Sequence, residues 1–346
     1  MGRPPFLYRS VQVCEGDYMP TICVDVMGSD QGPSVVLEGV ERALAKDAEL
    51  VVLLAGSDEE VTPFAEKHDR VRTVVSSEVI GMDEHPANAV RQKKDASIVR
   101  AAAAVKQGEA DGLFSAGSTG AVLTAATFGI GRLKGIKRPA LALILPGLDG
   151  HRTVFLDTGA NADVKPELMV DFARMGIAYA QVALGIQEPS VGLLTNGAED
   201  TKGSELTLAY HDILAHAKVN FSGNAEGVDL LGSRFDVIVA DGMTGNVALK
   251  SIESTGRFIL SRIKDSVAAS KKAAFGALLL KDSLKKTAGE LSGDTVGGAV
   301  LLGLSAPVIK AHGSAGAGAV CAGILAAATA VRGNLVGKIT EAIQVG

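Results

Sequence analysis

The chain has 346 residues, of which 47% are hydrophobic and 21% are charged, and its formal net charge is −5. This balance excludes the global basic excess of a nucleic-acid-binding protein, and the sequence lacks the long apolar run of a membrane-spanning helix. Because it contains no Trp and 41 Gly, we expect a core of Ala, Val, Leu and Ile, as in α/β proteins with buried parallel strands.

In chain order, residues 1–18 come first and lack the apolar centre of a secretory signal, so we expect a disordered N-terminal extension there. From residue 19 on, short apolar runs alternate with stretches of helical period, which predicts one α/β domain over 19–346. The expected strands are 21–28, 49–57, 70–77, 111–118, 140–146, 152–159, 190–196, 235–242 and 307–314. The clearest expected helices are 33–46, 96–107 and 166–183. This alternation predicts a doubly wound, mostly parallel sheet.

Most of these strands end in a cluster of small or polar residues. In open α/β sheets, ligands bind outside the carboxyl ends of the strands. We therefore expect the clusters to meet at one edge of the sheet.

The first cluster, DVMGSDQGP over 25–33, supplies Asp25 and Gly28. An aspartate that leaves a strand orients a hydroxyl, a lysine or a metal, or simply caps the next helix. We favour a place in the site, because the turn has more small residues than turning requires.

The next charged stretch, EHPANAVRQKKDAS over 84–97, supplies Arg91 and Lys94. Three residues apart, they share one face of the helix expected after Pro86. They are attractive as phosphate ligands, and a solvated helix face is the alternative.

The segment SAGSTG over 115–120 follows one strand and opens into an Ala-rich helix. Its candidate site residues are Ser115, Gly117, Ser118, Thr119 and Gly120. Such a turn aims backbone N–H groups and a helix dipole at one point, which suits phosphate. Close packing of small residues is the alternative. The segment is not a P-loop and has no P-loop lysine, which argues against a nucleoside triphosphatase.

Three later clusters, over 157–163, 195–205 and 240–250, combine carboxylates with asparagines and lysines. Their candidates are Asp157, Asn161, Lys202, Asp241, Asn246 and Lys250. They suit acid–base machinery, a divalent-metal site or loop caps, and His312 lies beside a similar turn. The three cysteines have no metal-type spacing, so we assign no metal ligand and expect no cofactor.

Residues 245–290 are too long and too helical for one crossover. They predict two helices joined near Phe275 and Gly276 that project from the body as a hairpin over about 250–290. Its candidate contact residues are Lys271, Lys272, Phe275, Leu278, Leu279, Lys281 and Lys285. A basic hairpin with an apolar tip suits an acidic protein, an anionic lipid surface or the other subunit of a dimer. A second basic run, RLKGIKR over 132–138, is a further docking candidate.

Seven of these segments occur in the order found in PlsX-type phosphate acyltransferases. They are DVMGSDQGP, HPANAVRQKKDAS, LFSAGSTGA, DTGAN, NGAEDTKG, DGMTGNVALK and GGAVLLGLSAPVIKAHGS. The chain resembles this family from about residue 20 to 335. It departs from the family at 252–256 and at LSGDTVGGAV, and after His312 it is unusually rich in Ala and Gly.

The resemblance implies an isocitrate/isopropylmalate dehydrogenase-like, Rossmann-like α/β fold. It implies a cytoplasmic homodimer, with peripheral contact at the inner face of the cell membrane. The implied reaction converts long-chain acyl-[acyl carrier protein] and inorganic phosphate to acyl phosphate and free carrier protein. The acyl phosphate then passes to a membrane glycerol-3-phosphate acyltransferase, and no nucleic acid takes part.

In that reaction, we expect the turn over 115–120 to hold phosphate or the oxyanion, helped by Lys94 and Arg91. His312 is the candidate proton donor. The nearest alternative is a short-chain phosphotransacylase that uses acyl-coenzyme A. A metal- and NAD-dependent dehydrogenase and a non-catalytic lipid-surface scaffold rank lower.

Overall fold

The computed structural model describes residues 19–280 and 297–344. The expected disordered extension over 1–18 lies outside the described residues, and the organisation of 19–346 as one domain stays a prediction. The strands are β1 (Thr21–Asp25), β2 (Val51–Gly56), β3 (Val71–Val75), β4 (Gly112–Ser115), β5 (Ala140–Pro146), β6 (Arg152–Leu156), β7 (Val191–Leu194), β8 (Phe221–Ala225), β9 (Val237–Val239), β10 (Ala299–Leu302) and β11 (Val308–Lys310).

The helices follow most of the strands, as expected for a doubly wound fold. They are α1 (Pro33–Lys46), α2 (Asp58–Ala65), α3 (Pro86–Gln92), α4 (Ser97–Lys106), α5 (Thr119–Gly129), α6 (Pro166–Ala183), α7 (Glu205–Ala215), α8 (Gly242–Ala268), α9 (Lys271–Leu279), α11 (Ala317–Arg332) and α12 (Leu335–Gln344), with two 3-10 turns, η1 (Leu148–Gly150) and η2 (Gly227–Leu231). The predicted bounds of α1 and α6 are confirmed, since a proline at the first position of each starts the helix.

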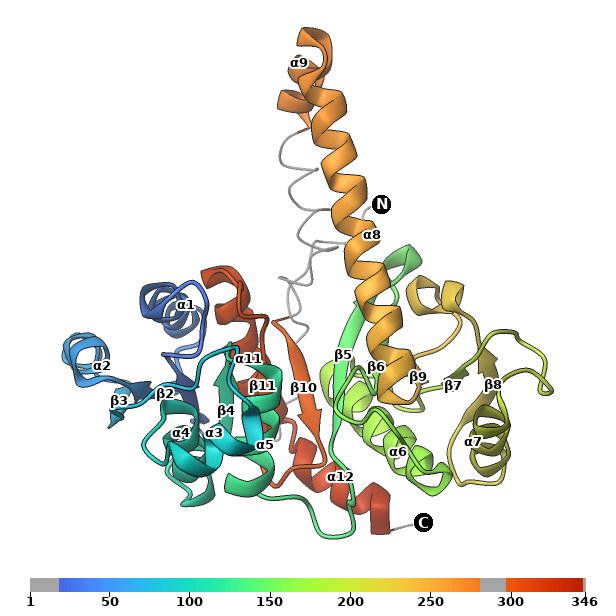
Figure 1. Cartoon of the computed structure of the whole chain (residues 1–346), viewed down its shortest axis with the longest axis horizontal. Helices are drawn as coiled ribbons and strands as arrows, with labels where there is room; N and C mark the ends of the chain where they lie inside the picture. The colour runs from blue at the N-terminus through green and yellow to red at the C-terminus, as the bar shows by residue number, and fades with distance from the viewer. Residues whose placement is uncertain (1–18, 281–296, 345–346) are drawn as a thin grey trace.

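The described strands form one 11-stranded sheet in the order β3-β2-β1-β4-β11-β10-β5-β6-β9-β7-β8 (Figure 1). Seven of the strand pairs are parallel, so the predicted mostly parallel sheet is confirmed. Strand β10 is antiparallel to both neighbours, β11 and β5, and β5 is antiparallel to β6.

These reversals change where the polar strand ends lie. The carboxyl ends of β6, β9 and β7 face the opposite edge of the sheet from those of β1, β4 and β11. The polar ends therefore form two clusters, and the expectation of a single edge is wrong. Two strands were also missed. β8 reads FSGNA, with too little hydrophobic character to signal a strand, and β10 is a four-residue apolar run without periodicity.

Helices cover both faces of the sheet. On one face, α1, α6, α11 and α12 share the largest apolar core with the strands. On the other, α3, α4 and α5 cover the first half of the sheet, while η2 and the beginning of α8 cover the second half. The site clusters lie on this second face.

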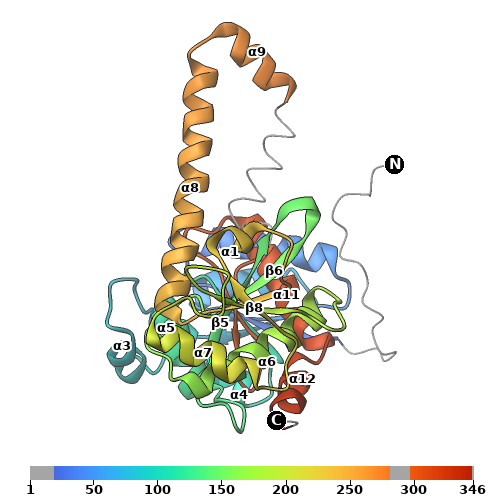
Figure 2. The same ribbon diagram turned by 90° about the vertical axis from the view of Figure 1, so that its right-hand side faces the viewer.

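Helix α8 leaves the body and projects from it, and α9 folds back at its far end (Figures 1 and 2). The projection is as predicted, but the junction is not. The helix breaks at Ala269 and Ser270, whose side chain caps α9, instead of at Phe275 and Gly276, which lie inside α9. Serine is a strong N-cap, which explains the earlier break. Lys281 and Lys285 lie outside the described residues.

Among the residues that the structure describes, no single helix is long and apolar enough to cross a membrane. Helices α11 and α12, which meet at an angle of 52°, are together long and apolar enough for a span, by length and composition alone.

The tight contact of α1 with α11 generates a stability prediction. A Cβ on Gly39 would lie 2.5 Å from Val320 Cβ, so Gly39→Ala should overpack this contact and lower the free energy of unfolding by about 1–3 kcal/mol. The control is Gly318→Ala in α11, where an added Cβ meets nothing within 4 Å. We expect this variant to raise the free energy of unfolding by up to about 1 kcal/mol, because Ala has a higher helix propensity than Gly. Denaturant unfolding measures both, and an unchanged midpoint for Gly39→Ala contradicts the prediction.

Candidate active site

Three residues that end adjacent strands form the centre of the first cluster. Asp25, Ser115 and Lys310 are the last residues of β1, β4 and β11, and strand pairing sets Ser115 directly between the other two. In-register residues of parallel strands share a face of the sheet. Here it is the face covered by α4 and α5, because the residues two positions earlier in each strand pack in that core.

The Asp25 carboxylate ties this cluster together. The hydroxyls of Ser97 and Ser115 each donate to one of its oxygens at 2.7 Å, and the backbone N–H groups of Met27 and Gly28 donate to it as well. Burial raises the pKa of Asp25 above the usual range, and the four hydrogen bonds oppose that rise. The carboxylate thus orients β4, the start of α4 and the turn after β1.

The glycine turns after β1 and β4 touch each other. A Cβ on Gly28 would lie 2.6 Å from Oδ2 of Asp25 and 2.9 Å from Cα of Gly117, so only glycine fits. The Gly117 N–H donates to Ser115 Oγ at 3.0 Å, and that hydroxyl donates to Asp25. Ser115 and Gly117 therefore shape the turn through internal hydrogen bonds.

Helix α5 begins directly after this turn. Its N-cap, Ser118, makes no side-chain capping hydrogen bond, and Ser118, Thr119 and Gly120 are half-buried. The first N–H groups of a helix lack intrahelical partners and carry partial positive charge. With the hydroxyls of Ser118 and Thr119, they form the part of the SAGSTG segment that suits an anion. Gly120 lies against Pro86, which places α3 beside it.

Lys310 is a site residue that the sequence reasoning missed. It is half-buried, and burial lowers the pKa of its ammonium, as does Lys250, whereas Glu253 and Asp30 oppose the change. Lys250 and Glu253 are three residues apart on α8, so this face of α8 lies toward the end of β11. A lysine at the end of the apolar run PVIK was the available signal.

His312 lies two residues beyond Lys310 and is exposed. The Ser314 N–H points to His312 Nδ1 at 3.3 Å, and Ser314 Oγ lies 2.8 Å from the same atom. Because a backbone N–H can only donate, Nδ1 is the acceptor and Nε2 carries the proton of the neutral ring. The ring thus presents an N–H donor at its outer edge.

The second cluster surrounds Asp157, directly after β6. The carboxylate accepts hydrogen bonds from the N–H groups of Leu141, Gly159, Ala160 and Asn161, and from the Asn161 side chain. Burial raises the pKa of Asp157, and these bonds oppose that rise. Asp157 and Asn161 therefore build the loop that receives α8.

Helix α8 packs directly on that loop through two glycines. A Cβ on Gly242 would overlap the Asn161 carbonyl oxygen, and one on Gly245 would overlap that of Asp157. The Asp241 side chain caps α8 by accepting from the Thr244 N–H at 2.9 Å. Lys250 follows Asp241 by nine residues, roughly 13 Å along a helix, so α8 joins the two clusters.

Near the start of α8, a cavity of about 280 Å³ opens at the carboxyl ends of β7 and β9. Its lining includes Thr195, Asn196, Ser204, Asp241 and Thr244. Of the predicted residues nearby, Asn246 is half-buried beside Gly159, whereas Lys202 is exposed in the loop after β7.

Arg91 and Lys94 are both exposed, and neither has an ion pair among the described residues. Helix α3 ends at Gln92, so Lys94 lies in the loop after it, and the prediction that the two residues share one helix face is wrong. Lys93 instead pairs with Glu84 at 2.7 Å. Within 19–280 and 297–344, no group of three or more His, Cys, Asp or Glu side chains is arranged to hold a metal ion.

Sequence comparison connects this site with a family. Residues 20–338 match the family model described as "Fatty acid synthesis protein". The chain is 45% identical over 323 residues to a phosphate acyltransferase of Lysinibacillus sphaericus, covering 93% of this chain and 98% of that protein. It is 45% identical over 326 residues to a phosphate acyltransferase of Limosilactobacillus reuteri, covering 92% and 95%.

Structure comparison supports the fold. A phosphotransacetylase from Streptococcus pyogenes matches with a TM-score of 0.57 and 17% identity, covering 90% of this chain and 94% of that one. A branched-chain phosphotransacylase from Enterococcus faecalis matches with a TM-score of 0.56 and 14% identity, covering 90% and 99%. The predicted α/β fold is confirmed.

The Asp25 network generates a prediction. Asp25→Asn places an NH₂ donor among four donors, so we expect the free energy of unfolding to fall by about 2–4 kcal/mol. The matched control is Asp83→Asn at an exposed position, where we expect less than about 0.5 kcal/mol. Denaturant unfolding checks both, and equal stabilities for the two variants would show that the network contributes nothing.

Proposed function

The chain belongs to the phosphate acyltransferase family of fatty acid synthesis proteins, and we propose that it transfers a long-chain acyl group from acyl carrier protein to inorganic phosphate. The chain is thus an acyltransferase of lipid synthesis. The observation that carries the proposal is the start of α5, where uncapped N–H groups and two hydroxyls lie beside the ordered ends of β1, β4 and β11.

The proposed chemistry requires no nucleophile from the protein. Inorganic phosphate is present in part as a dianion at neutral pH, and the dianion attacks the thioester carbon. The new bond joins a phosphate oxygen to the acyl carbon, and the carbon–sulfur bond breaks. The departing thiolate, with a pKa near 8.5 by analogy with cysteine, accepts a hydrogen bond from His312 Nε2–H as it leaves and takes up a proton from water. The protein contributes placement and stabilisation of the tetrahedral oxyanion.

The residues divide by what they contact. We propose that the first N–H groups of α5, with Ser118 and Thr119, contact phosphate, and that Arg91 in α3 and Lys94 in the loop after it contribute positive charge. Ser115, Gly117, Gly28 and Asp25 hold that turn in shape, as Asp157 and Asn161 hold the loop beneath α8. The proposed catalytic set around them is His312, Asp241, Asn246 and Lys250, and Lys202 stands at the outer edge of the second cluster.

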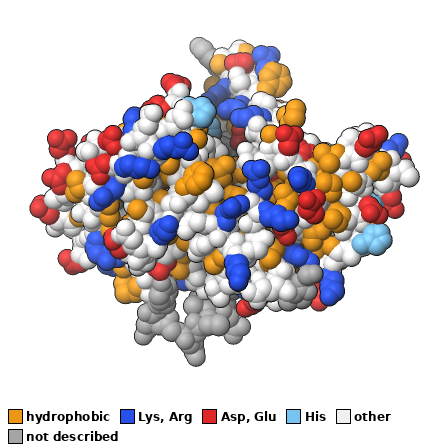
Figure 3. All heavy atoms as spheres, turned by 60° about the horizontal axis from the view of Figure 1, so that its bottom comes forward, with side chains coloured by type: hydrophobic (Ala, Val, Ile, Leu, Met, Phe, Trp, Pro, Cys, Tyr) orange, Lys and Arg blue, Asp and Glu red, His pale blue; other side chains and the backbone are white. Residues whose placement is uncertain are grey.

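Charge supports the choice of carrier protein as acyl donor. In the loop between α5 and β5, Arg132, Lys134, Lys137 and Arg138 are all exposed. Figure 3 shows Lys and Arg side chains across the middle of the lower face, with Asp and Glu mostly toward its two sides. An acidic carrier protein is attracted to such a surface.

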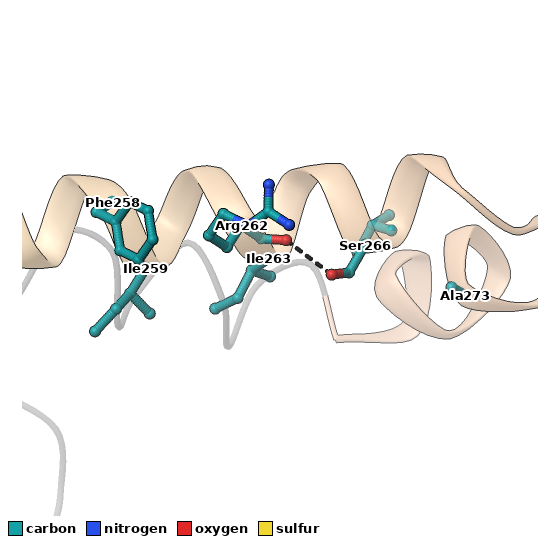
Figure 4. A pocket seen from close by; sticks show the side chains of 7 residues that line it. Phe258, Ile259, Arg262, Ile263, Ser266 and Ala273 are labelled. Atoms are coloured by element: carbon teal, nitrogen blue, oxygen red, sulfur yellow. Dashed lines mark hydrogen bonds between the residues drawn. The ribbon is translucent and has the colours of Figure 1, made fainter.

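An apolar groove on α8 supports the homodimer. It has a volume of about 370 Å³ and is lined by Phe258, Ile259, Arg262, Ile263, Ser266, Val267 and Ala273. Ile259 and Ile263 point to the same side of α8 (Figure 4), and Phe258 is 65% exposed. We propose that α8 of a second copy covers this groove, because apolar surface on an isolated helix is costly in water.

The tip supports a peripheral membrane contact. Phe275, Leu278 and Leu279 of α9 are 64%, 65% and 73% exposed, and Lys272 beside them is exposed too. Lys271 belongs to the same proposed surface by sequence. We propose that this tip binds the inner face of the cell membrane, where the acyl phosphate passes to a membrane glycerol-3-phosphate acyltransferase.

The reaction is tested by thiol release from palmitoyl-acyl carrier protein with and without phosphate. We expect phosphate-dependent release, with acyl phosphate trapped by hydroxylamine. Release from acetyl-coenzyme A alone would instead identify a short-chain phosphotransacylase.

Lys94→Ala should raise the phosphate KM, and an unchanged KM removes Lys94 from the site.

Two double variants distinguish the proposed dimer contact in the α8 groove from the proposed membrane contact at the α9 tip. We expect Ile259→Asp with Ile263→Asp to convert a dimer to a monomer in sedimentation velocity. Leu278→Asp with Leu279→Asp should keep the dimer and abolish flotation with phosphatidylglycerol vesicles. Val228→Asp, at a 77% exposed position in η2, is the control for an added charge. If the tip variant dissociates the dimer, α9 is part of the subunit contact.

A further inference from the structure

The ammonium of Lys310 lacks a partner in the described structure. The side chain is half-buried at the end of β11, and it makes no hydrogen bond or ion pair with any residue in 19–280 or 297–344. Removing an ammonium from water without a partner is costly, and an anion that binds beside it offsets part of that cost. The position therefore favours occupation by a small anion.

The surroundings of Lys310 give that anion a location. Ser115 is its in-register neighbour on β4, on the same face of the sheet, and Ser118 at the start of α5 follows only three residues later. Helix α5 also contacts β11. The uncapped N–H groups of α5 and the Lys310 ammonium thus lie at the same edge of the sheet.

Charges from two other elements act on Lys310. Lys250 and Glu253 face it from α8, and Asp30 faces it from the turn after β1. Lys250 and Lys310 repel each other across this space, and a dianion between them removes the repulsion. The carboxylates of Glu253 and Asp30 offset part of the positive charge of the two lysines.

We propose that Lys310 is the principal phosphate-binding side chain, holding the phosphate dianion against the first turn of α5 with Lys250 on the far side. This inference rests on the proposed function and adds to it a residue that lies in one of the seven segments but was not among the predicted site residues. Lysine suits the role because it presents a compact point charge with three donors. After transfer, the same group holds the phosphoryl end of the acyl phosphate.

Kinetics with matched variants test the inference. We expect Lys310→Met to raise the phosphate KM by about 10- to 100-fold, on the order of a charge-assisted hydrogen bond, with a smaller change in the KM for palmitoyl-acyl carrier protein. Lys310→Arg should recover part of the phosphate affinity. The control is Lys106→Met, at an exposed position at the end of α4, with no change in either KM. A phosphate KM unchanged in Lys310→Met overturns the inference.

Competitive lysine labelling of the wild-type protein gives a readout independent of turnover. Reductive methylation followed by peptide mass spectrometry reports each lysine separately. Burial lowers the pKa of Lys310, so its amine should be deprotonated at a lower pH than the ordinary lysine amine. We expect inorganic phosphate to slow labelling of Lys310 and to leave Lys106 unchanged.

The outcomes separate the two proposals. Phosphate protection of Lys310 without phosphate-dependent thiol release supports the anion site and overturns the proposed reaction. Thiol release without protection, and with an unchanged KM in Lys310→Met, supports the reaction and overturns the role of Lys310. Circular dichroism of Lys310→Met and Lys310→Arg identifies a variant that fails to fold, in which case the wild-type labelling decides.

Discussion

The site depends on one buried carboxylate, Asp25. Its oxygens accept four hydrogen bonds that join the ends of β1 and β4 to the first residue of α4. This arrangement fixes Ser115, which fixes the Gly117 turn and so the direction in which α5 begins. Since a helix N-terminus binds an anion only where its N–H groups point, a group outside the proposed phosphate contacts decides where the proposed phosphate site lies.

A second carboxylate, Asp157, plays the same part in the other half of the sheet, and α8 connects the two. The helix rests on the Asp157 loop through Gly242 and Gly245, where any side chain would collide with backbone oxygens. From there it carries Lys250 and Glu253 to the end of β11. The same helix then continues into the projection that carries the apolar groove, so the proposed subunit contact and the candidate site share one helix.

Much of the site was predictable, because the polar turns follow apolar strands in a regular order. Ser118 and Thr119 lie at the start of a helix as expected, and the projecting helix was evident from its length. Which residues of each turn make internal hydrogen bonds, and which remain available to a ligand, could not be predicted. Nothing local distinguishes Ser115, whose hydroxyl is used internally, from Ser118, whose hydroxyl is not, because the difference is the presence of Asp25 90 residues away.

By itself, the sequence determined the α/β class, the bounds of α1 and α6, the glycine turns and the family, because these depend on periodicity, proline and local order along the chain. Only the tertiary structure decided which strand ends meet. Strand β10 is four residues long and without periodicity, yet its antiparallel pairing divides the polar ends into two clusters. It also decided that Lys310 lies beside Ser115, since strand register is a relation between segments far apart in the chain.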